Sequence, residues 1–214
     1  MTLVRRAMIL CAIGLLAASA AMAGVPSAAT STIPTAINLS GTTGGVADIL
    51  TAKIITVKDA SSNPVPGSVV ILNVSTCTAN DIRLGSTQPF AGMTVNCGAK
   101  TVTGVTNSTG QVTFELVGSA NVTVGNGPGI TTACGSLTAD GVALGNVVIG
   151  AFDEDGVNGV NPSDTSFWLQ DRNGAYRARS DFDGSGAINP ADGSLILQVR
   201  NGGGSTTSSA SACP

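Results

Sequence analysis

Between residues 24 and 150 the chain consists of short apolar runs separated by residues that favour turns. Val112, Phe114 and Leu116 alternate there with Thr113 and Glu115. A period of two residues, bounded by Gly, Asn, Pro and Ser, is typical of half-buried antiparallel strands. Similar runs occupy residues 54–59, 68–74, 121–125 and 137–152. About seven strands over roughly 120 residues predict a β-sandwich.

The pattern changes after residue 150, where two segments repeat each other at a spacing of 28 residues. Each begins with an acidic loop of twelve residues, at positions 153–164 and 181–192, and continues with helical signals. An asparagine that can cap a helix precedes a proline, and an Asn-Gly pair ends each run. These signals are Asn161, Pro162 and Asn173-Gly174 in the first repeat, and Asn189, Pro190 and Asn201-Gly202 in the second. The sequence predicts two loop–helix units, with Trp168 in their core.

The first 23 residues have the pattern of a secretory signal peptide. Arg5 and Arg6 precede the apolar residues 7–20, and Ala21-Met22-Ala23 offers a cleavage site before Gly24. An uncleaved membrane anchor is the alternative, because the apolar run is nearly long enough to span a bilayer. The small residues and the cleavage site favour removal. We expect a secreted or cell-surface protein with no membrane insertion after cleavage.

The charge of the chain is concentrated in the repeats. The formal net charge is −3, and removal of the signal leaves thirteen acids and eight bases, a net charge of −5. Eight of those acids lie between Asp153 and Asp192. Local acidity of this kind suits a cation site and argues against a nucleic-acid surface.

Four cysteines remain after removal of the signal peptide. An even number in an exported chain indicates two disulfides, and four cysteines allow three pairings. We expect Cys77–Cys97 within the β-rich part and Cys134–Cys213 joining the tail to it. The alternative is an intermolecular bond through Cys213, which lies at the end of a Gly/Ser/Thr-rich tail, residues 203–214.

The acidic loops carry oxygen-bearing residues at the positions that a calcium loop uses. The expected ligands of the second loop are Asp181, Asp183, Ser185, the carbonyl of Ala187, Asn189 and Asp192. Those of the first are Asp153, Asp155, the carbonyl of Gly159, Asn161 and Asp164. Val157 at position 5 of the first loop has no side-chain oxygen, although Asn158 or Glu154 in a shifted register, or water, could replace it. We therefore expect two calcium ions, with the second loop as the stronger site.

The tandem spacing, the Asn-Pro-x-Asp ending and the aspartate at position 12 make residues 151–202 resemble a type I dockerin. The resemblance implies two calcium loop–helix repeats that attach the chain to a cohesin-like partner through loop positions 10 and 11 and the helices. Those loop positions are Pro162-Ser163 and Pro190-Ala191, not the Ser-Thr type pairs common in the family. The candidate partner surface comprises Trp168, Gln170, Arg172, Gln198 and Arg200.

Two segments of the β-rich part resemble bacterial immunoglobulin-like repeats of surface adhesins. They are VKDASSNPVPGSVVIL at residues 57–72 and TNSTGQVTFEL at residues 106–116. The resemblance implies an immunoglobulin-like β-sandwich over residues 24–150. The expected fold is therefore mostly β, with a small α-helical dockerin-like module at residues 151–202.

Catalysis has little support in the sequence. The chain contains no histidine, which removes histidine-based triads and most general-base schemes. Acids outside the repeats are isolated. We expect a non-catalytic, secreted calcium-binding protein that attaches to another extracellular protein, with the immunoglobulin-like domain as a spacer or scaffold. A self-assembling surface or filament subunit is the alternative, and an accessory role in extracellular polysaccharide degradation is a lesser one.

Overall fold

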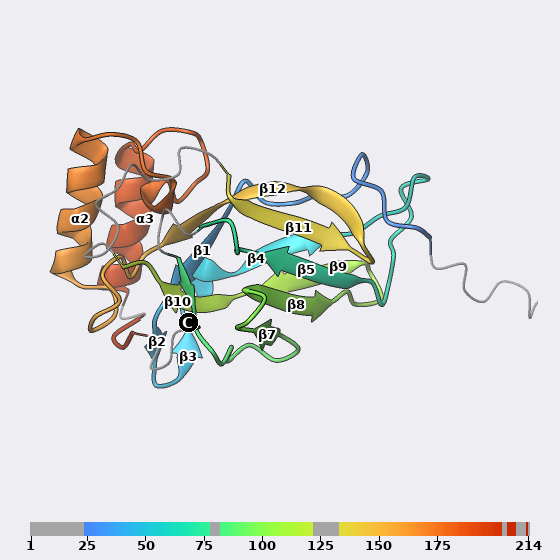
Figure 1. Cartoon of the computed structure of the whole chain (residues 1–214), viewed down its shortest axis with the longest axis horizontal. Helices are drawn as coiled ribbons and strands as arrows, with labels where there is room; N and C mark the ends of the chain where they lie inside the picture. The colour runs from blue at the N-terminus through green and yellow to red at the C-terminus, as the bar shows by residue number, and fades with distance from the viewer. Residues whose placement is uncertain (1–23, 78–81, 122–132, 203–204, 209–212, 214) are drawn as a thin grey trace, which may run out of the picture.

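The computed structural model describes residues 24–77, 82–121, 133–202, 205–208 and 213, so the expected signal peptide lies outside the described residues. More of these residues lie in strands than in helices, and two helices lie side by side at one end (Figure 1). The prediction of a mostly β chain with a small helical part near its C-terminus is confirmed.

Most of the strands are short, and several of them overlap the predicted apolar runs. They are β1 (Ala36–Ser40), β2 (Thr42–Thr43), β3 (Val46–Ala47), β4 (Lys53–Thr56), β5 (Val69–Asn73), β6 (Arg83–Leu84), β7 (Thr94–Asn96), β8 (Thr101–Val105), β9 (Gln111–Phe114), β10 (Leu116–Ser119), β11 (Gly135–Ala139) and β12 (Val142–Ala151). Short 3₁₀ turns are η1 (Ile49–Thr51) and η3 (Ala178–Ser180). The run predicted at residues 121–125 falls almost wholly outside the described residues.

Eight of the strands form one curled sheet in the order β6-β10-β1-β12-β11-β5-β8-β7. The strand β1 runs parallel to both of its neighbours, β10 and β12, and the other pairs in this sheet are antiparallel. The strands β4 and β9 form a separate pair, as do β2 and β3. The arrangement is that of half a barrel and does not confirm the expected immunoglobulin-like sandwich.

One apolar core joins the curled sheet to the β4–β9 pair. Leu39, Leu72 and Leu137 of the sheet are fully buried together with Ile55 of β4 and Phe114 of β9. The alternation of apolar and polar residues explains this, because a strand turns successive side chains to opposite faces. In β9 the burial alternates as predicted, with Val112 and Phe114 buried and Gln111 exposed.

The helices are α2 (Pro162–Asn173) and α3 (Pro190–Asn201), and both begin where the sequence predicts. Each has a capping box, in which the N-cap asparagine accepts from the first turn and the N3 aspartate accepts from the N-cap backbone. The N3 residues are Asp164 and Asp192, the last residues of the acidic loops. The end of each loop therefore also starts a helix.

The helix pair is attached to the sheet through the start of each acidic loop. Phe152 and Phe182 pack with their ring centroids 4.6 Å apart in a small core that also contains Trp168, as predicted for that residue. Asn38 of β1 donates from Nδ2 to the Phe182 carbonyl at 2.9 Å, and Thr35 donates to the Asp183 carbonyl at 2.7 Å. The second loop is thereby fastened to the strand β1.

The predicted disulfide pairing is wrong. The structure contains Cys77–Cys134 and Cys97–Cys213. Cys77 follows β5 and Cys134 precedes β11, and these strands are antiparallel neighbours in the sheet, so the two cysteines meet at one end. Residues 76–97 are therefore not a loop closed by its own disulfide, as the first pairing implied.

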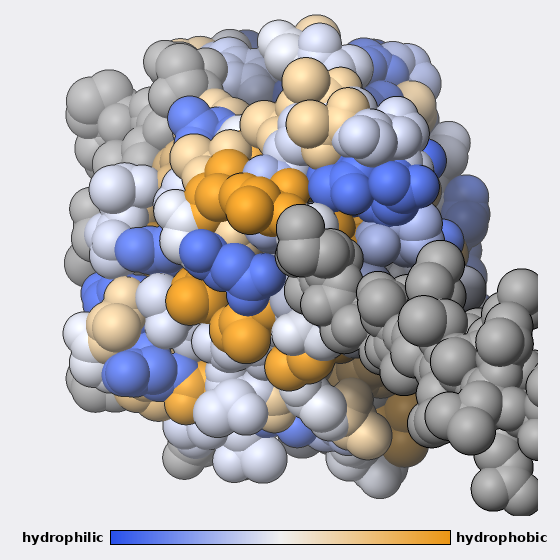
Figure 2. Space-filling model, turned by 90° about the vertical axis from the view of Figure 1, so that its right-hand side faces the viewer, coloured by the Kyte–Doolittle hydropathy of each residue, from blue (hydrophilic) through white to orange (hydrophobic). Residues whose placement is uncertain are grey.

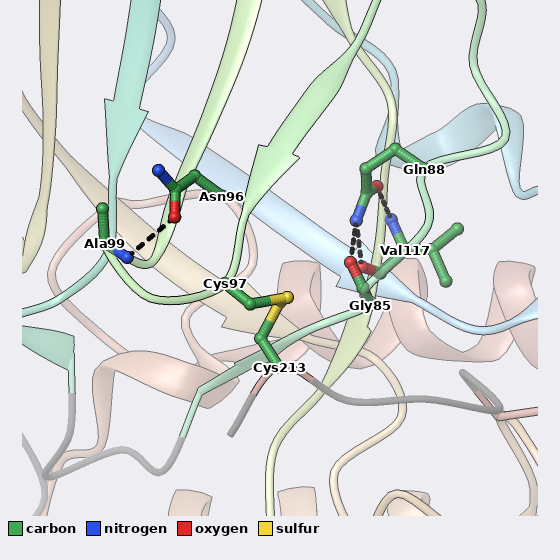
Figure 3. The surroundings of a disulfide bond; sticks show 7 residues. All are labelled: Gly85, Gln88, Asn96, Cys97, Ala99, Val117 and Cys213. Carbon is green, nitrogen blue, oxygen red and sulfur yellow. Dashed lines mark hydrogen bonds between the residues drawn. A yellow bond between two sulfur atoms is a disulfide. The ribbon is translucent and has the colours of Figure 1, made fainter.

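The second disulfide joins the two edges of the curled sheet. Cys97 follows β7 at one edge, and the backbone N–H of Cys213 donates to the Leu84 carbonyl of β6 at the other edge, at 2.6 Å. Figure 3 shows this disulfide and, beside it, Gln88 bound to Gly85 and Val117. Strands far apart in the sheet order meet here because the sheet curls. Both described disulfides are intrachain and typical of an oxidising compartment.

Among the residues that the structure describes, no helix is both long enough and apolar enough to cross a bilayer.

Candidate metal centre

The two acidic loops each bring three aspartates together. Carboxylate oxygens of Asp153, Asp155 and Asp164 lie within 4.8 Å of one another, and so do those of a second set. The second set is Asp181, Asp183 and Asp192. These are positions 1, 3 and 12 of both loops, so the structure assembles the predicted carboxylate ligands in the predicted groups.

The backbones of the two loops turn alike at positions 4 and 6 and differ at position 7, where Gly159 has a φ of 65° and Ala187 has no positive φ. Position 4 has a positive φ in both, 70° at Gly156 and 69° at Gly184. Position 6 does as well, 61° at Asn158 and 87° at Gly186. Asparagine enters the left-handed region more readily than most residues, so Asn158 can replace a glycine there, as expected. The repeat in sequence is therefore a repeat in conformation at positions 4 and 6.

In the second loop, backbone N–H groups converge on the carboxylates. Asp181 accepts from the amides of Ser185 at 3.0 Å and Gly186 at 2.8 Å, and Asp192 accepts from those of Asp183 at 3.1 Å and Asn189 at 2.9 Å. These bonds fix the side chains that line the loop. Asp192 closes the loop by binding both its beginning and its end.

The remaining predicted ligands of the second loop lie next to one another. The Ser185 hydroxyl donates to the Ala187 carbonyl at 3.3 Å. Asn189 donates from Nδ2 to that carbonyl at 3.2 Å and to the Ser185 hydroxyl at 3.4 Å, while its Oδ1 accepts from the Ala191 amide of α3 at 2.8 Å. Asn189 thus caps the helix with its oxygen and turns its amide to the loop, so its role as a ligand stays a prediction.

The first loop repeats this network with one gap. Asp164 accepts from the amides of Glu154, Asp155 and Asn161 at 2.7, 3.2 and 2.8 Å. Asn161 donates from Nδ2 to the carbonyls of Val157 and Gly159 at 3.0 and 3.1 Å. The Val157 side chain is 55 % exposed and offers no oxygen to the loop, as its sequence position implied.

Glu154 does not replace that missing oxygen, because its carboxylate lies in a buried ion-pair cluster behind the loop. It accepts from the Ser180 hydroxyl at 2.7 Å, and Arg179 Nε lies 3.6 Å from its other oxygen. Arg179 in turn binds both carboxylate oxygens of Asp171, at 2.8 and 3.0 Å. Burial and then the nearby Asp171 raise the pKa of Glu154 well above its usual range, although Arg179 opposes this. The sequence analysis missed this cluster.

Burial also disfavours the charged forms of the first-loop aspartates. It raises the pKa of Asp153 to about 6 and that of Asp164 to about 7, and neighbouring carboxylates add to both shifts. Burial and the other loop carboxylates raise the pKa of Asp192 as well. Carboxylates gathered in this way repel one another, and a bound cation would relieve that repulsion.

Hydroxyl groups from outside the loops contact the first aspartate of each. Ser208, in the tail, donates to Asp153 Oδ2 at 2.5 Å, and Tyr176, between α2 and η3, donates to Asp181 Oδ2 at 2.6 Å. The sequence analysis missed both. Tyr176 is the only tyrosine of the chain. Its position five residues before the second loop is the one feature of the sequence that could have indicated this contact.

The residues present fit a hard divalent cation. Carboxylate, carbonyl and hydroxyl oxygens are the groups that Ca²⁺ binds, typically six to eight of them. Each loop collects three carboxylates, and the second adds the Ser185 hydroxyl and the Ala187 carbonyl. Among the described residues, neither aspartate group includes a histidine or cysteine, the ligands that softer metals prefer.

The expected partner-surface residues divide by exposure. Gln170, Arg172 and Gln198 are exposed, whereas Arg200 is half-buried and donates to the Thr165 hydroxyl at 3.2 Å. Trp168 is 5 % exposed, with the Arg172 guanidinium 5.5 Å from its ring centroid. The helices also expose Leu169 and Leu197, at equivalent positions of the two repeats.

Comparisons with protein-family models, with curated proteins and with solved structures found no match to this chain.

Proposed function

We propose that this chain is a secreted, non-catalytic calcium-binding protein whose helix pair attaches it to another extracellular protein. In this proposal the dockerin-like repeats hold two calcium ions and present the helices, and the β-rich part serves as an immunoglobulin-like spacer or scaffold. One observation supports it above the others. Two groups of three aspartates, 28 residues apart, stand at the same positions of two loops whose backbones turn alike at positions 4 and 6.

Calcium would stabilise the helix pair because the loops and helices share residues. Asp164 and Asp192 each belong to a carboxylate group and to the capping box of a helix. A cation that holds these side chains therefore also holds the first turns of α2 and α3. The helix pair has only a small apolar core of its own, so metal binding would contribute directly to its folding.

The outer surface of the helix pair supports the attachment of a protein partner. Leu169 and Leu197 are 42 % and 37 % exposed at equivalent positions, each followed by an exposed glutamine. Apolar side chains surrounded by polar ones are typical of protein–protein contacts. The internal repeat gives this surface two similar halves, on which a partner could bind in either orientation.

Calorimetry tests the metal part of the proposal. Ca²⁺ titrated into the mature protein, freed of metal with EDTA, should bind at two sites and raise the melting temperature. At a free concentration of about 100 times the dissociation constant, one site adds roughly 2.7 kcal/mol to the free energy of unfolding. No heat of binding and no shift in melting would remove calcium from the proposal.

Affinity capture from culture medium of the source cells tests the partner. Protein recovered on the wild-type chain in Ca²⁺ should be lost in EDTA and reduced on a Leu169→Asp, Leu197→Asp variant. Val46→Asp, which changes an exposed valine of β3, is the matched control and should leave recovery unchanged. Equal recovery in Ca²⁺ and EDTA would contradict calcium-dependent attachment.

A second candidate function, self-association through the β-rich part, has an observation of its own. Val69 and Val105 pair across β5 and β8 and are 39 % and 55 % exposed. Figure 2 shows apolar side chains gathered on the end of the molecule remote from the helices. The intrachain Cys97–Cys213 bond removes the covalent link that the tail cysteine had suggested. Light scattering that finds a monomer in Ca²⁺, unchanged by Val105→Lys, would exclude this candidate.

A further inference from the structure

The tail residues 205–208, here called the strap, lie between β2 and the first acidic loop. Thr207 and Thr42 of β2 exchange two backbone hydrogen bonds, at 2.7 and 2.9 Å. On the other side, the Val160 amide donates to the Ser205 carbonyl at 2.8 Å. Ser205 is fully buried and its hydroxyl contacts that of Ser40. The strap is therefore part of the folded structure and packs directly against the loop.

Two glycines make room for the strap. A Cβ at Gly159 would overlap the Ser205 carbonyl oxygen, and one at Gly41 would overlap the Thr207 carbonyl oxygen. Gly159 is position 7 of the first loop, and Ala187 holds that position in the second. The first loop thus lacks a side chain at the place where the strap contacts it.

The Ser208 hydroxyl enters this loop. It donates to Asp153 Oδ2 at 2.5 Å and accepts from the Gly159 amide at 2.9 Å. A hydroxyl has one donor and two acceptor positions, so one lone pair of Ser208 Oγ has no part in these two bonds. The loop's own position 5 is Val157, which cannot supply an oxygen, whereas the second loop has the Ser185 hydroxyl there.

We infer that the strap completes the first cation site, with Ser208 supplying the hydroxyl oxygen that Val157 cannot. This inference rests on the proposed binding of calcium by the loops. The first site is then built from two segments of the chain about 50 residues apart, whereas the predicted ligands of the second all lie in one loop. Cys213 lies five residues after Ser208, and its disulfide with Cys97 fastens the chain beyond the strap to the sheet edges.

Calorimetric titration of the full mature chain with Ca²⁺ alone tests the inference. Ser208→Ala should weaken the first site about tenfold, within the range found for groups that support metal ligands, and leave the second unchanged. Thr206→Ala is the matched control, because its side chain contacts Thr43 and not the loop, and it should change neither site. Equal affinities for wild type and Ser208→Ala at both sites would overturn the inference.

A second substitution distinguishes a supplied oxygen from general support of the loop. Val157→Ser places a hydroxyl at position 5, so it should restore the affinity that Ser208→Ala loses and gain less in the wild-type chain. If Val157→Ser gives the same gain in both backgrounds, Ser208 does not replace the position-5 oxygen and the inference is wrong.

Amide hydrogen exchange in EDTA gives a readout without any cation. The Gly159 amide should exchange several-fold faster in Ser208→Ala, because Ser208 Oγ is its acceptor, while the Gly186 amide of the second loop should not change. An unchanged exchange rate at Gly159 would contradict the hydrogen bond between the strap and the loop and would overturn the inference. A wild-type chain that binds one Ca²⁺, lost in Asp181→Ala, would overturn the inference but keep the proposed function. Binding at neither site would remove both.

Discussion

The two acidic loops have the same backbone turns and the same three aspartates, but different residues support them. Position 2 of the first loop is Glu154, in a buried cluster with Arg179 and Asp171. Position 2 of the second is Phe182, which packs on Phe152. A repeat in sequence can therefore preserve the ligand positions while each copy adapts to the part of the molecule behind it.

The outward contacts of the loops differ in the same way. The first loop is contacted by the tail, in which Ser208 donates to Asp153 and accepts from the Gly159 amide. The second has its own hydroxyl at Ser185 and a nearby tyrosine, Tyr176, on Asp181. The first loop should therefore depend on the tertiary structure more strongly than the second, and four experiments test this difference.

The largest expected effect comes from the buried cluster behind the first loop. Arg179→Met should lower the free energy of unfolding by about 3–5 kcal/mol, because it leaves the buried carboxylate of Glu154 without its cation and that of Asp171 with Arg177 alone. Urea unfolding measures this. Arg172→Met, an exposed arginine over Trp168, is the control and should lose about 0.5–1 kcal/mol. Equal losses would show that the cluster gives no special support to the first loop.

The next largest effect is expected from the disulfides, whose removal should affect calcium binding at the two loops differently. Replacing either cysteine pair by serine should lower stability by about 2–5 kcal/mol. Only Cys97→Ser, Cys213→Ser should also weaken calcium binding at the first loop, because it releases the strap segment. The matched control is the double variant Cys77→Ser, Cys134→Ser, because the disulfide that it removes joins β5 to β11 and does not hold the strap. Calorimetry at a temperature where both variants remain folded gives the comparison.

Single aspartate substitutions should then remove the sites one at a time. Asp181→Ala should abolish the tighter calcium site and Asp153→Ala the weaker one. Each loss should reduce the stabilisation by calcium by roughly 2.7 kcal/mol when the free ion is at about 100 times the dissociation constant of that site. Melting curves in Ca²⁺ and EDTA measure it. If Asp153→Ala removed the tighter site, the predicted order of the two loops would be wrong.

A smaller difference is expected in the pH dependence of the metal-free protein. The folded pKa values of Asp153 and Asp164, about 6 and about 7, lie above the unfolded value near 3.9. Such groups contribute stability that is fully present below about pH 4 and is lost as the pH rises through the folded values, so stability in EDTA should fall between about pH 4 and pH 7. The raised pKa of Glu154 acts in the same direction.

The matched variants for this effect are Asp164→Asn and Asp192→Asn. Both remove a carboxyl with a raised pKa at position 12. Asp164→Asn should flatten the pH dependence more, because burial raises the pKa of Asp164 to about 7, within the range of the measurement. Urea midpoints in EDTA from about pH 4 to pH 8 provide the measurement. An equal change in both variants would mean that the loops titrate alike.

The local structure of this protein could be predicted from patterns along the chain. Alternation located strands such as β5 and β9, and the Asn-Pro and Asn-Gly pairs located both ends of α2 and α3. The 28-residue repeat located all six aspartates of the two groups. These features could be predicted because each depends on residues within about a dozen positions, where side-chain period, capping and turn chemistry act directly.

Which distant segments meet became visible in the folded chain alone. The curl of the sheet brings β6 and β7 together at Cys213, and thus sets a disulfide pairing that spacing along the chain did not reveal. It also places Ser208 on Asp153 and Arg179 between Glu154 and Asp171. Contacts of this kind follow from how strands are ordered and how the sheet curves, and no pattern within a single segment encodes that order.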